Sequence, residues 1–173
     1  NPDEMIDIGV QCSLEQLLEH GFFHADPHPG NLLALEDGRL CYLDFGMMSE
    51  VSKESRSGLI QAVVHLVNKN FDKLSQDFVK LGFLSEEVNL EPIVPAFQDV
   101  FINAVEMGVS KMDFKSVTDD MSGVMYKFPF KLPPYYALII RSLLTLEGIA
   151  LSVDPNFKIL GAAYPYFARR LME

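Results

Sequence analysis

The chain has 173 residues, 49% of them hydrophobic, so it can bury one sizeable core and is expected to form a single domain or lobe. Its net charge is −10 and it carries only 14 Lys and Arg residues, which argues against a nucleic-acid partner because neutralising phosphates requires clustered basic residues. The same charge disfavours electrostatic docking on anionic lipid but leaves hydrophobic docking open.

The first predicted helix lies just before a histidine-containing loop. Ser13-Leu14-Glu15-Gln16 has the form of a capping box, Leu17 and Leu18 continue the apolar spacing, and Gly21 ends the segment. We expect this helix to begin near Ser13 and to deliver the chain to the loop that follows.

The loop is the most informative part of the sequence. Residues 24–31 read His-Ala-Asp-Pro-His-Pro-Gly-Asn, and Asp44-Phe45-Gly46 follows after an apolar run. Asn31 lies five positions after Asp26, and Asp44 lies thirteen positions after Asn31. This is the spacing of phosphoryl-transfer sites of the protein-kinase type, in which one Asp orients the acceptor while an Asn and a second Asp hold the metal.

A predicted β-hairpin explains the second spacing. Residues 32–35 and 40–43 read as short strands around the turn signal Asp37-Gly38. A hairpin returns the chain to its starting point, so Asn31 and Asp44 are expected to lie close together. Two oxygen ligands would then converge on one Mg²⁺ ion that phosphates and water also bind.

The remainder of the chain is predicted to be helical. The expected helices are 52–68, 70–81, 92–107, 113–126, a long apolar helix that follows the Pro-rich residues 128–134 and ends near 152, and 157–172 with a kink at Pro165. The apolar face of the first is expected to contain Leu59, Ile60, Val63, Val64 and Val67. The fold class is therefore mainly α with a small β-hairpin (α+β), as in a protein-kinase-like C-lobe.

The most apolar stretch, residues 135–153, is interrupted by Arg141 and Glu147, so we expect a core helix rather than a membrane span. Charged residues in an apolar helix usually find partners, and both side chains are expected to serve the structure. Their partners are not readable from the sequence.

The stretches HADPHPGN, LDFGMMSE, RSLLTLEGIALSVDPNFKIL and YPYFARRL resemble the UbiB (AarF) atypical kinases, with details most like plastid and cyanobacterial members. The resemblance covers essentially the whole chain. It implies an ATP- and Mg²⁺-dependent kinase or ATPase linked to prenyl-lipid and quinone metabolism. It implies that Asp26 is catalytic and that Asn31 and Asp44 bind the metal and its nucleotide. His28, beside the catalytic Asp, is predicted to contact phosphate or the backbone of the metal site.

Residues 1–21 contain neither a Gly-rich phosphate loop nor the nucleotide-binding motifs of this family. We therefore expect residues 1–173 to be a C-terminal lobe without its ATP-cradling N-lobe. Residues 24–46 would form the catalytic and metal loops, and residues 52–173 a helical extension. The isolated chain is expected to be inactive, because its N-lobe in the same polypeptide would be a necessary partner.

The segment after Asp44-Phe45-Gly46 bears on the acceptor. Only about six residues separate it from the helix start at Ser52, too few for a peptide-binding activation segment. This favours a lipid or prenylquinone-related small molecule, or water, as acceptor. The resemblance further implies peripheral membrane or lipid-droplet association and a chloroplast location, at the plastoglobule or thylakoid. A mitochondrial location or the cytoplasmic face of a bacterial membrane are the alternatives.

Three other interpretations stay open. His24, Asp26 and His28 alternate as in a transition-metal site, although the two prolines and the later Asn and Asp fit phosphoryl transfer better. Small-molecule kinases of the aminoglycoside and choline kinase type share the loop pattern. A nucleotide-binding scaffold without turnover is the third. In a kinase-like fold we expect His24 to pack and hydrogen-bond the metal loop rather than to take part in chemistry.

Overall fold

The computed structural model describes residues 2–172, except for the side chains of residues 170 and 171. Helix α1 (Pro2–Glu15) continues into one π-helical turn, η1 (Gln16–His20), which ends at Gly21 with φ of 71°. The predicted start at Ser13 is wrong, because Ser13 lies inside a longer helix. Its buried hydroxyl lies 3.3 Å from the Tyr42 hydroxyl, so Ser13 joins α1 to the hairpin instead of capping a helix.

Two small antiparallel sheets follow. The predicted hairpin is confirmed as β2 (Leu32–Ala34) and β3 (Leu40–Tyr42). The sequence analysis missed the second sheet, in which β1 (Phe22–His24) pairs with β4 (Met48–Glu50). Three-residue strands carry too little periodicity to be recognised, and this pair closes only because the hairpin brings the two segments together.

The helices agree closely with the predicted ranges. They are α2 (Lys53–Val67), α3 (Phe71–Lys80), α4 (Ile93–Met107), the short 3₁₀ turn η3 (Val109–Lys111), α5 (Phe114–Lys127), α6 (Pro134–Leu151) and α7 (Ile159–Leu171). Ser52, Asn70 and Asp113 cap α2, α3 and α5 by accepting backbone N–H bonds through their side chains. The predicted apolar face of α2 is confirmed for Leu59, Ile60 and Val63, which pack against the core beside the buried Ala62 and Leu66. Val67 is 41% exposed, so its place on that face was predicted wrongly.

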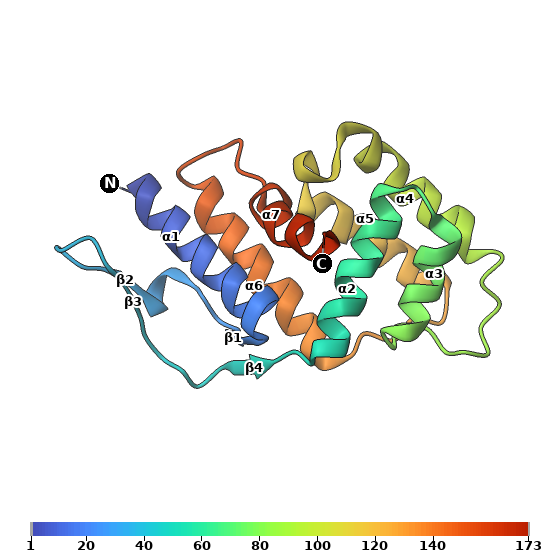
Figure 1. Ribbon diagram of the computed structural model, residues 1–173, viewed down its shortest axis with the longest axis horizontal. Helices are drawn as coiled ribbons and strands as arrows, with labels where there is room; N and C mark the ends of the chain where they lie inside the picture. Colours follow the sequence, from blue (N-terminus) through green and yellow to red (C-terminus); the bar gives the residue numbers. More distant parts are fainter. Residues whose placement is uncertain (1, 173) are drawn as a thin grey trace.

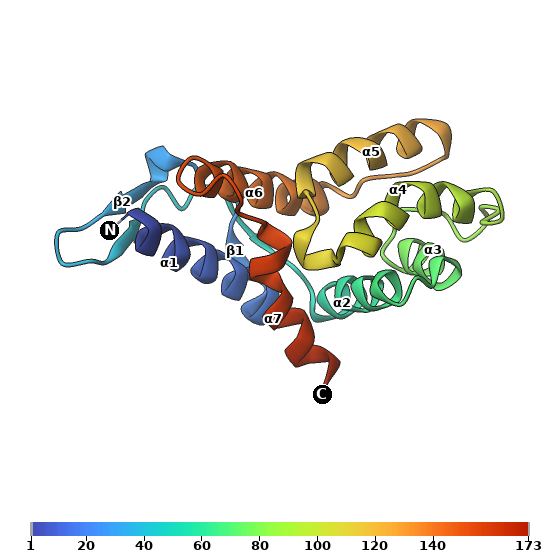
Figure 2. The ribbon, with the colours of Figure 1, turned by 90° about the horizontal axis from the view of Figure 1, so that it is seen from above.

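The hairpin lies at one end of the molecule, where α1 and α6 run side by side, and helices α2 to α5 gather at the other end (Figures 1 and 2). The core at this second end is rich in aromatic rings. Phe78 of α3 lies 4.7 Å from Phe97 of α4 between ring centroids, and Phe83 lies 4.5 Å from Tyr136 of α6. The first contact packs α3 on α4, and the second joins α6 to the loop that follows α3.

Helix α6 is long and apolar enough to cross a membrane by length and composition alone. In this fold it packs against other elements through buried residues on one face, which are Tyr136, Ile139, Ser142, Leu146, Glu147 and Ala150. Glu147 accepts a hydrogen bond from the backbone N–H of Ile159 at 3.3 Å, and its burial raises the pKa of its carboxyl. Of this stretch, 33% is buried by the rest of the chain, so its assignment as a core helix stays a prediction.

Candidate active site

The predicted catalytic loop is anchored between the two small sheets. β1 leads into it and is held by β4, and the backbone N–H of Ala25 adds a bond to the carbonyl of Met47 at 2.8 Å. At the far end of the loop, one turn of 3₁₀ helix, η2 (Pro29–Asn31), feeds into β2. Residues 24–31 are therefore tied at both ends to the segment that carries Asp44.

His24 joins the catalytic loop to the metal loop, as predicted. Its Nδ1 accepts the backbone N–H of Asp26 at 3.1 Å, so the proton resides on Nε2. Nε2 then donates to the carbonyls of Leu43 at 3.0 Å and Asp44 at 2.8 Å. Both ring nitrogens of this buried side chain are used by the backbone, which leaves neither for a metal ion. Among residues 2–172, no cluster of three or more His, Cys, Asp and Glu side chains is placed to hold a metal ion.

Asn31 and Asp44 stand at the two ends of the hairpin. The backbone N–H of Leu43 donates to the carbonyl of Asn31 at 2.8 Å and closes the hairpin base, so Asp44 emerges beside Asn31. Asn31 is buried, and its side-chain nitrogen donates to the Asp26 carbonyl at 3.1 Å. This bond leaves the side-chain oxygen of Asn31 as an available ligand.

Asp44 has an unusual backbone conformation. Its φ is +52°, in the left-handed region that Asp and Asn tolerate better than most residues. The carboxylate folds back so that Oδ1 accepts the N–H of Gly46 at 3.2 Å. Within the described residues no hydrogen bond reaches Oδ2, which is therefore a second oxygen available to a hard cation.

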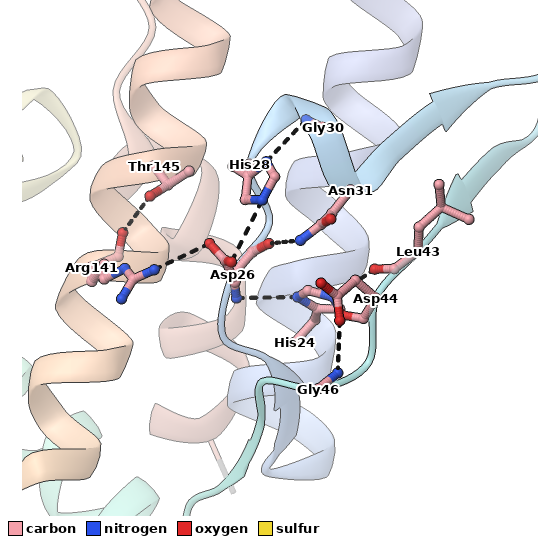
Figure 3. A network of polar contacts seen from close by, with 10 residues as sticks. All are labelled: His24, Asp26, His28, Gly30, Asn31, Leu43, Asp44, Gly46, Arg141 and Thr145. Carbon is pink, nitrogen blue, oxygen red and sulfur yellow. Dashed lines mark hydrogen bonds and ion pairs between the residues drawn. The ribbon is translucent and has the colours of Figure 1, made fainter.

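Two side chains hold the carboxylate of Asp26 (Figure 3). Arg141 reaches from α6 and places Nη2 3.3 Å from Oδ1. His28 places Nε2 3.6 Å from Oδ2, while its Nδ1 accepts the N–H of Gly30 at 3.0 Å. This backbone contact is within the catalytic loop, so the predicted contact of His28 with phosphate or with the backbone of the metal site stays a prediction. The sequence analysis did not identify Arg141 as a site residue. A charged residue in an apolar helix indicates that a partner exists, but this partner lies 115 positions away in the sequence.

A separate apolar pocket of about 200 Å³ lies against the same loop. The inner face of the hairpin forms one wall, α1 forms the second and the C-terminal half of α6 forms the third. Tyr42 docks the hairpin on α1 by donating to the Gly9 carbonyl at 3.3 Å, and burial raises the pKa of its hydroxyl to about 12. The pocket is lined by Met5, Ile6, Gly9, Val10, Pro29, Leu32, Ala34, Leu40, Leu146 and Ile149.

The structure brings the four predicted site residues, Asp26, His28, Asn31 and Asp44, together on two adjoining loops. Asn31 contacts the Asp26 backbone, His28 contacts the Asp26 carboxylate, and His24 joins Asp26 to Asp44. Asp44 is exposed and Asp26 is partly exposed, so both are accessible from solvent. This arrangement offers oxygen atoms suited to a hard cation beside a carboxylate that is accessible from solvent.

Comparison with known proteins identifies relatives over nearly the whole chain. Residues 1–78 match the ABC1 atypical kinase-like domain, and residues 98–158 match the UbiB helical domain. An uncharacterized protein of Synechocystis is 64% identical over 168 residues, which cover 97% of this chain and 25% of that protein. The Arabidopsis thaliana protein Activity of BC1 complex kinase 3, chloroplastic, is 56% identical over 169 residues, which cover 98% of this chain and 24% of the relative.

A third relative, Activity of BC1 complex kinase 1, chloroplastic, also from Arabidopsis thaliana, is 45% identical over 167 residues, which cover 96% of this chain and 24% of the relative. The chain thus spans about a quarter of the length of the curated relatives it matches. Both plant proteins are chloroplastic by name.

Proposed function

Because the chain belongs to the ABC1/UbiB family of atypical kinase-like proteins, we propose that it carries the catalytic and metal-binding loops of an ATP- and Mg²⁺-dependent phosphoryl-transfer protein. The observation that carries this proposal is the joint placement of Asp26, Asn31 and Asp44. The buried side chain of His24 hydrogen-bonds to the backbone of both Asp26 and Asp44, and so fixes the position of one loop relative to the other.

The donors present fit Mg²⁺. Mg²⁺ prefers oxygen ligands and is usually held by one or two protein oxygens together with phosphates and water. Asn31 would offer its side-chain oxygen, because its nitrogen already donates to the Asp26 carbonyl, and Asp44 would offer Oδ2. When bound, Mg²⁺ would neutralise negative charge on the phosphates of ATP.

Asp26 has a different role in this proposal. Its carboxylate would accept a hydrogen bond from an acceptor hydroxyl or from water and orient that group toward the transferred phosphate. His28 and Arg141 hold the carboxylate from two sides, so its direction is set before a reactant arrives. Little proton abstraction is needed, since the transition state of phosphoryl transfer is loose.

For the acceptor we propose a lipid or prenylquinone-related molecule. The apolar pocket supports this, because Pro29 of the catalytic loop forms part of its wall and would contact an apolar chain bound there. The short link from Asp44 to α2 supports it as well, since it offers no platform for a peptide. A molecule of this kind would place the protein at a membrane or lipid-droplet surface, for which we propose the plastoglobule or thylakoid of the chloroplast.

The hairpin supports the proposal that an N-lobe of the same polypeptide covers the site. Side chains alternate along a strand, so Leu32 and Ala34 face the apolar pocket while Leu33 and Leu35 face the other way. Leu33 is 49% exposed and Phe45, beside Asp44, is 63% exposed. Exposed apolar side chains gathered beside a site are typical of a surface that another domain covers.

The test is Mg²⁺-dependent binding and hydrolysis of ATP by the full-length protein that contains this chain, with and without prenylquinone-like lipids. Asp44→Asn should weaken binding of Mg²⁺-nucleotide and slow turnover together. Asp26→Asn should leave the nucleotide Kd nearly unchanged while lowering kcat about 100-fold or more. Asp72→Asn, an exposed acid on α3, is the matched control.

Equal loss of nucleotide binding in the Asp26 and Asp44 variants would contradict this division of roles. Binding of nucleotide without turnover in the wild-type protein would favour a nucleotide-binding scaffold. Efficient phosphorylation of varied peptides would contradict the proposed acceptor class.

A further inference from the structure

One ion pair joins the two segments that match different domains. Asp26 lies within residues 1–78, which match the kinase-like domain, and Arg141 lies within residues 98–158, which match the helical domain. Their side chains meet at 3.3 Å between Nη2 and Oδ1. The helical segment therefore contacts the catalytic loop directly, at the carboxylate of Asp26.

The backbone and the carboxylate of Asp26 are held by different parts of the chain. Its N–H donates to His24 and its carbonyl accepts from Asn31, so the kinase-like segment places the main chain. Its carboxylate contacts His28 from the same loop and Arg141 from α6. Among the side chains that the structure describes, Arg141 is the one from another element that contacts this carboxylate.

Helix α6 is a firm base for such a contact. One face is buried, with Tyr136 against Phe83 and with Glu147 bonded to the backbone of Ile159. Arg141 projects from the opposite, exposed face, and its side chain is 56% exposed. An ion pair this exposed contributes little to stability, so we expect its main effect to be on the orientation of the Asp26 carboxylate.

We propose that Arg141 is the positioning residue of Asp26 and that the helical segment 98–158 thereby completes the phosphoryl-transfer site. The inference rests on the proposed function. The guanidinium contacts Oδ1 and His28 lies beside Oδ2, so the two side chains together set the direction in which the carboxylate meets an acceptor hydroxyl. Its positive charge also offsets the repulsion between Asp26 and the phosphate that approaches it.

The experiment compares Arg141→Met and Arg141→Lys with the wild type in the full-length protein. Arg141→Met is expected to lower kcat of ATP turnover about 10- to 100-fold, the size of effect that a displaced reacting group produces. The KM for ATP and the Kd of Mg²⁺-nucleotide should stay within about twofold, because this substitution removes no ligand of the metal or phosphates. Arg141→Lys, and free guanidinium added to Arg141→Met, should each restore part of the lost rate.

Lys115→Met is the matched control, because Lys115 also lies in the helical segment and forms an exposed ion pair, with Asp119 at 2.9 Å. It should leave kcat unchanged. An unchanged kcat in Arg141→Met would overturn the inference while leaving the proposed function intact. A loss of nucleotide binding parallel to the loss of rate, without rescue by guanidinium, would also overturn it. Absence of turnover in the wild-type protein would instead remove the proposed function, and this inference with it.

Discussion

Residues 24–46 and helices α3 and α4 are held in different ways. The first region consists of loops and three-residue strands joined by backbone hydrogen bonds, and the carboxylates of Asp26 and Asp44 in it are accessible to solvent. The second is held by aromatic rings, with Phe97 fully buried among Phe78, Phe101 and Phe130. The proposed chemistry and the main source of stability therefore lie in separate parts of the chain.

This separation means that most changes should affect one property and spare the other. Site substitutions such as Asp44→Asn keep the hydrogen-bonding capacity and the tolerance of positive φ, so they should alter turnover at little cost in stability. Core substitutions should do the reverse. Arg141 and Glu147 are exceptions to this expectation, because both lie on α6, which contacts the catalytic loop through Arg141 and the core through its buried face.

The largest effect is expected for Phe97→Ala. Removing this ring leaves a cavity among three aromatic neighbours and should lower the free energy of unfolding by about 3–5 kcal/mol, measured by urea denaturation. Phe45→Ala is the matched control, since Phe45 is 63% exposed and should lose less than about 1 kcal/mol. Equal losses in the two variants would show that the two regions do not differ as proposed.

A smaller effect is expected for Asp77→Ala. Asp77 of α3 is 3% exposed and lies 2.5 Å from Nδ1 of His65 in α2, so the pair joins two helices. Its removal leaves a half-buried imidazole without this partner and should cost about 1–3 kcal/mol by the same measurement. Asp72→Ala, on the exposed face of α3, should be nearly neutral. A neutral Asp77→Ala would show that the pair contributes nothing to the packing of α2 on α3.

The helices were predictable because their signals are local. Caps at Ser52, Asn70 and Asp113 and glycines after α3 and α4 mark the boundaries within one or two residues. The start of α1 was missed because Ser13 has the form of a cap, yet its hydroxyl is used by a tertiary contact with Tyr42. The pairing of β1 with β4 was missed for a related reason, since it depends on the fold between them.

The site was predictable in part. The spacing of Asp26, Asn31 and Asp44 identifies the loops, and the hairpin rule predicts that the last two adjoin. The partner of Arg141 was not predictable, because a contact across 115 positions depends on how α6 packs against the catalytic loop. The positive φ of Asp44 has no sequence signal beyond the residue type, because most Asp residues adopt ordinary negative φ.

The smallest effect is expected for Glu147→Gln, and it is a dependence on pH. Burial raises the pKa of the Glu147 carboxyl in the folded protein above the ordinary value of 4.5. The folded state therefore binds this proton more tightly than the unfolded chain does. The resulting destabilisation is absent below the unfolded-state pKa and develops as the pH rises through the folded-state pKa.

Glutamine removes the charge but still accepts the N–H of Ile159, so the variant should match the wild type near pH 4 and exceed it by up to about 1 kcal/mol near pH 7. Urea denaturation at the two pH values measures this, with Glu106→Gln on the exposed face of α4 as control. A variant less stable than the wild type at pH 7 would mean that the ionised carboxylate itself holds α7 on α6. In that case the position of α6, and with it that of Arg141, would depend on a charged contact in the core. The site and the core would then be coupled through this helix.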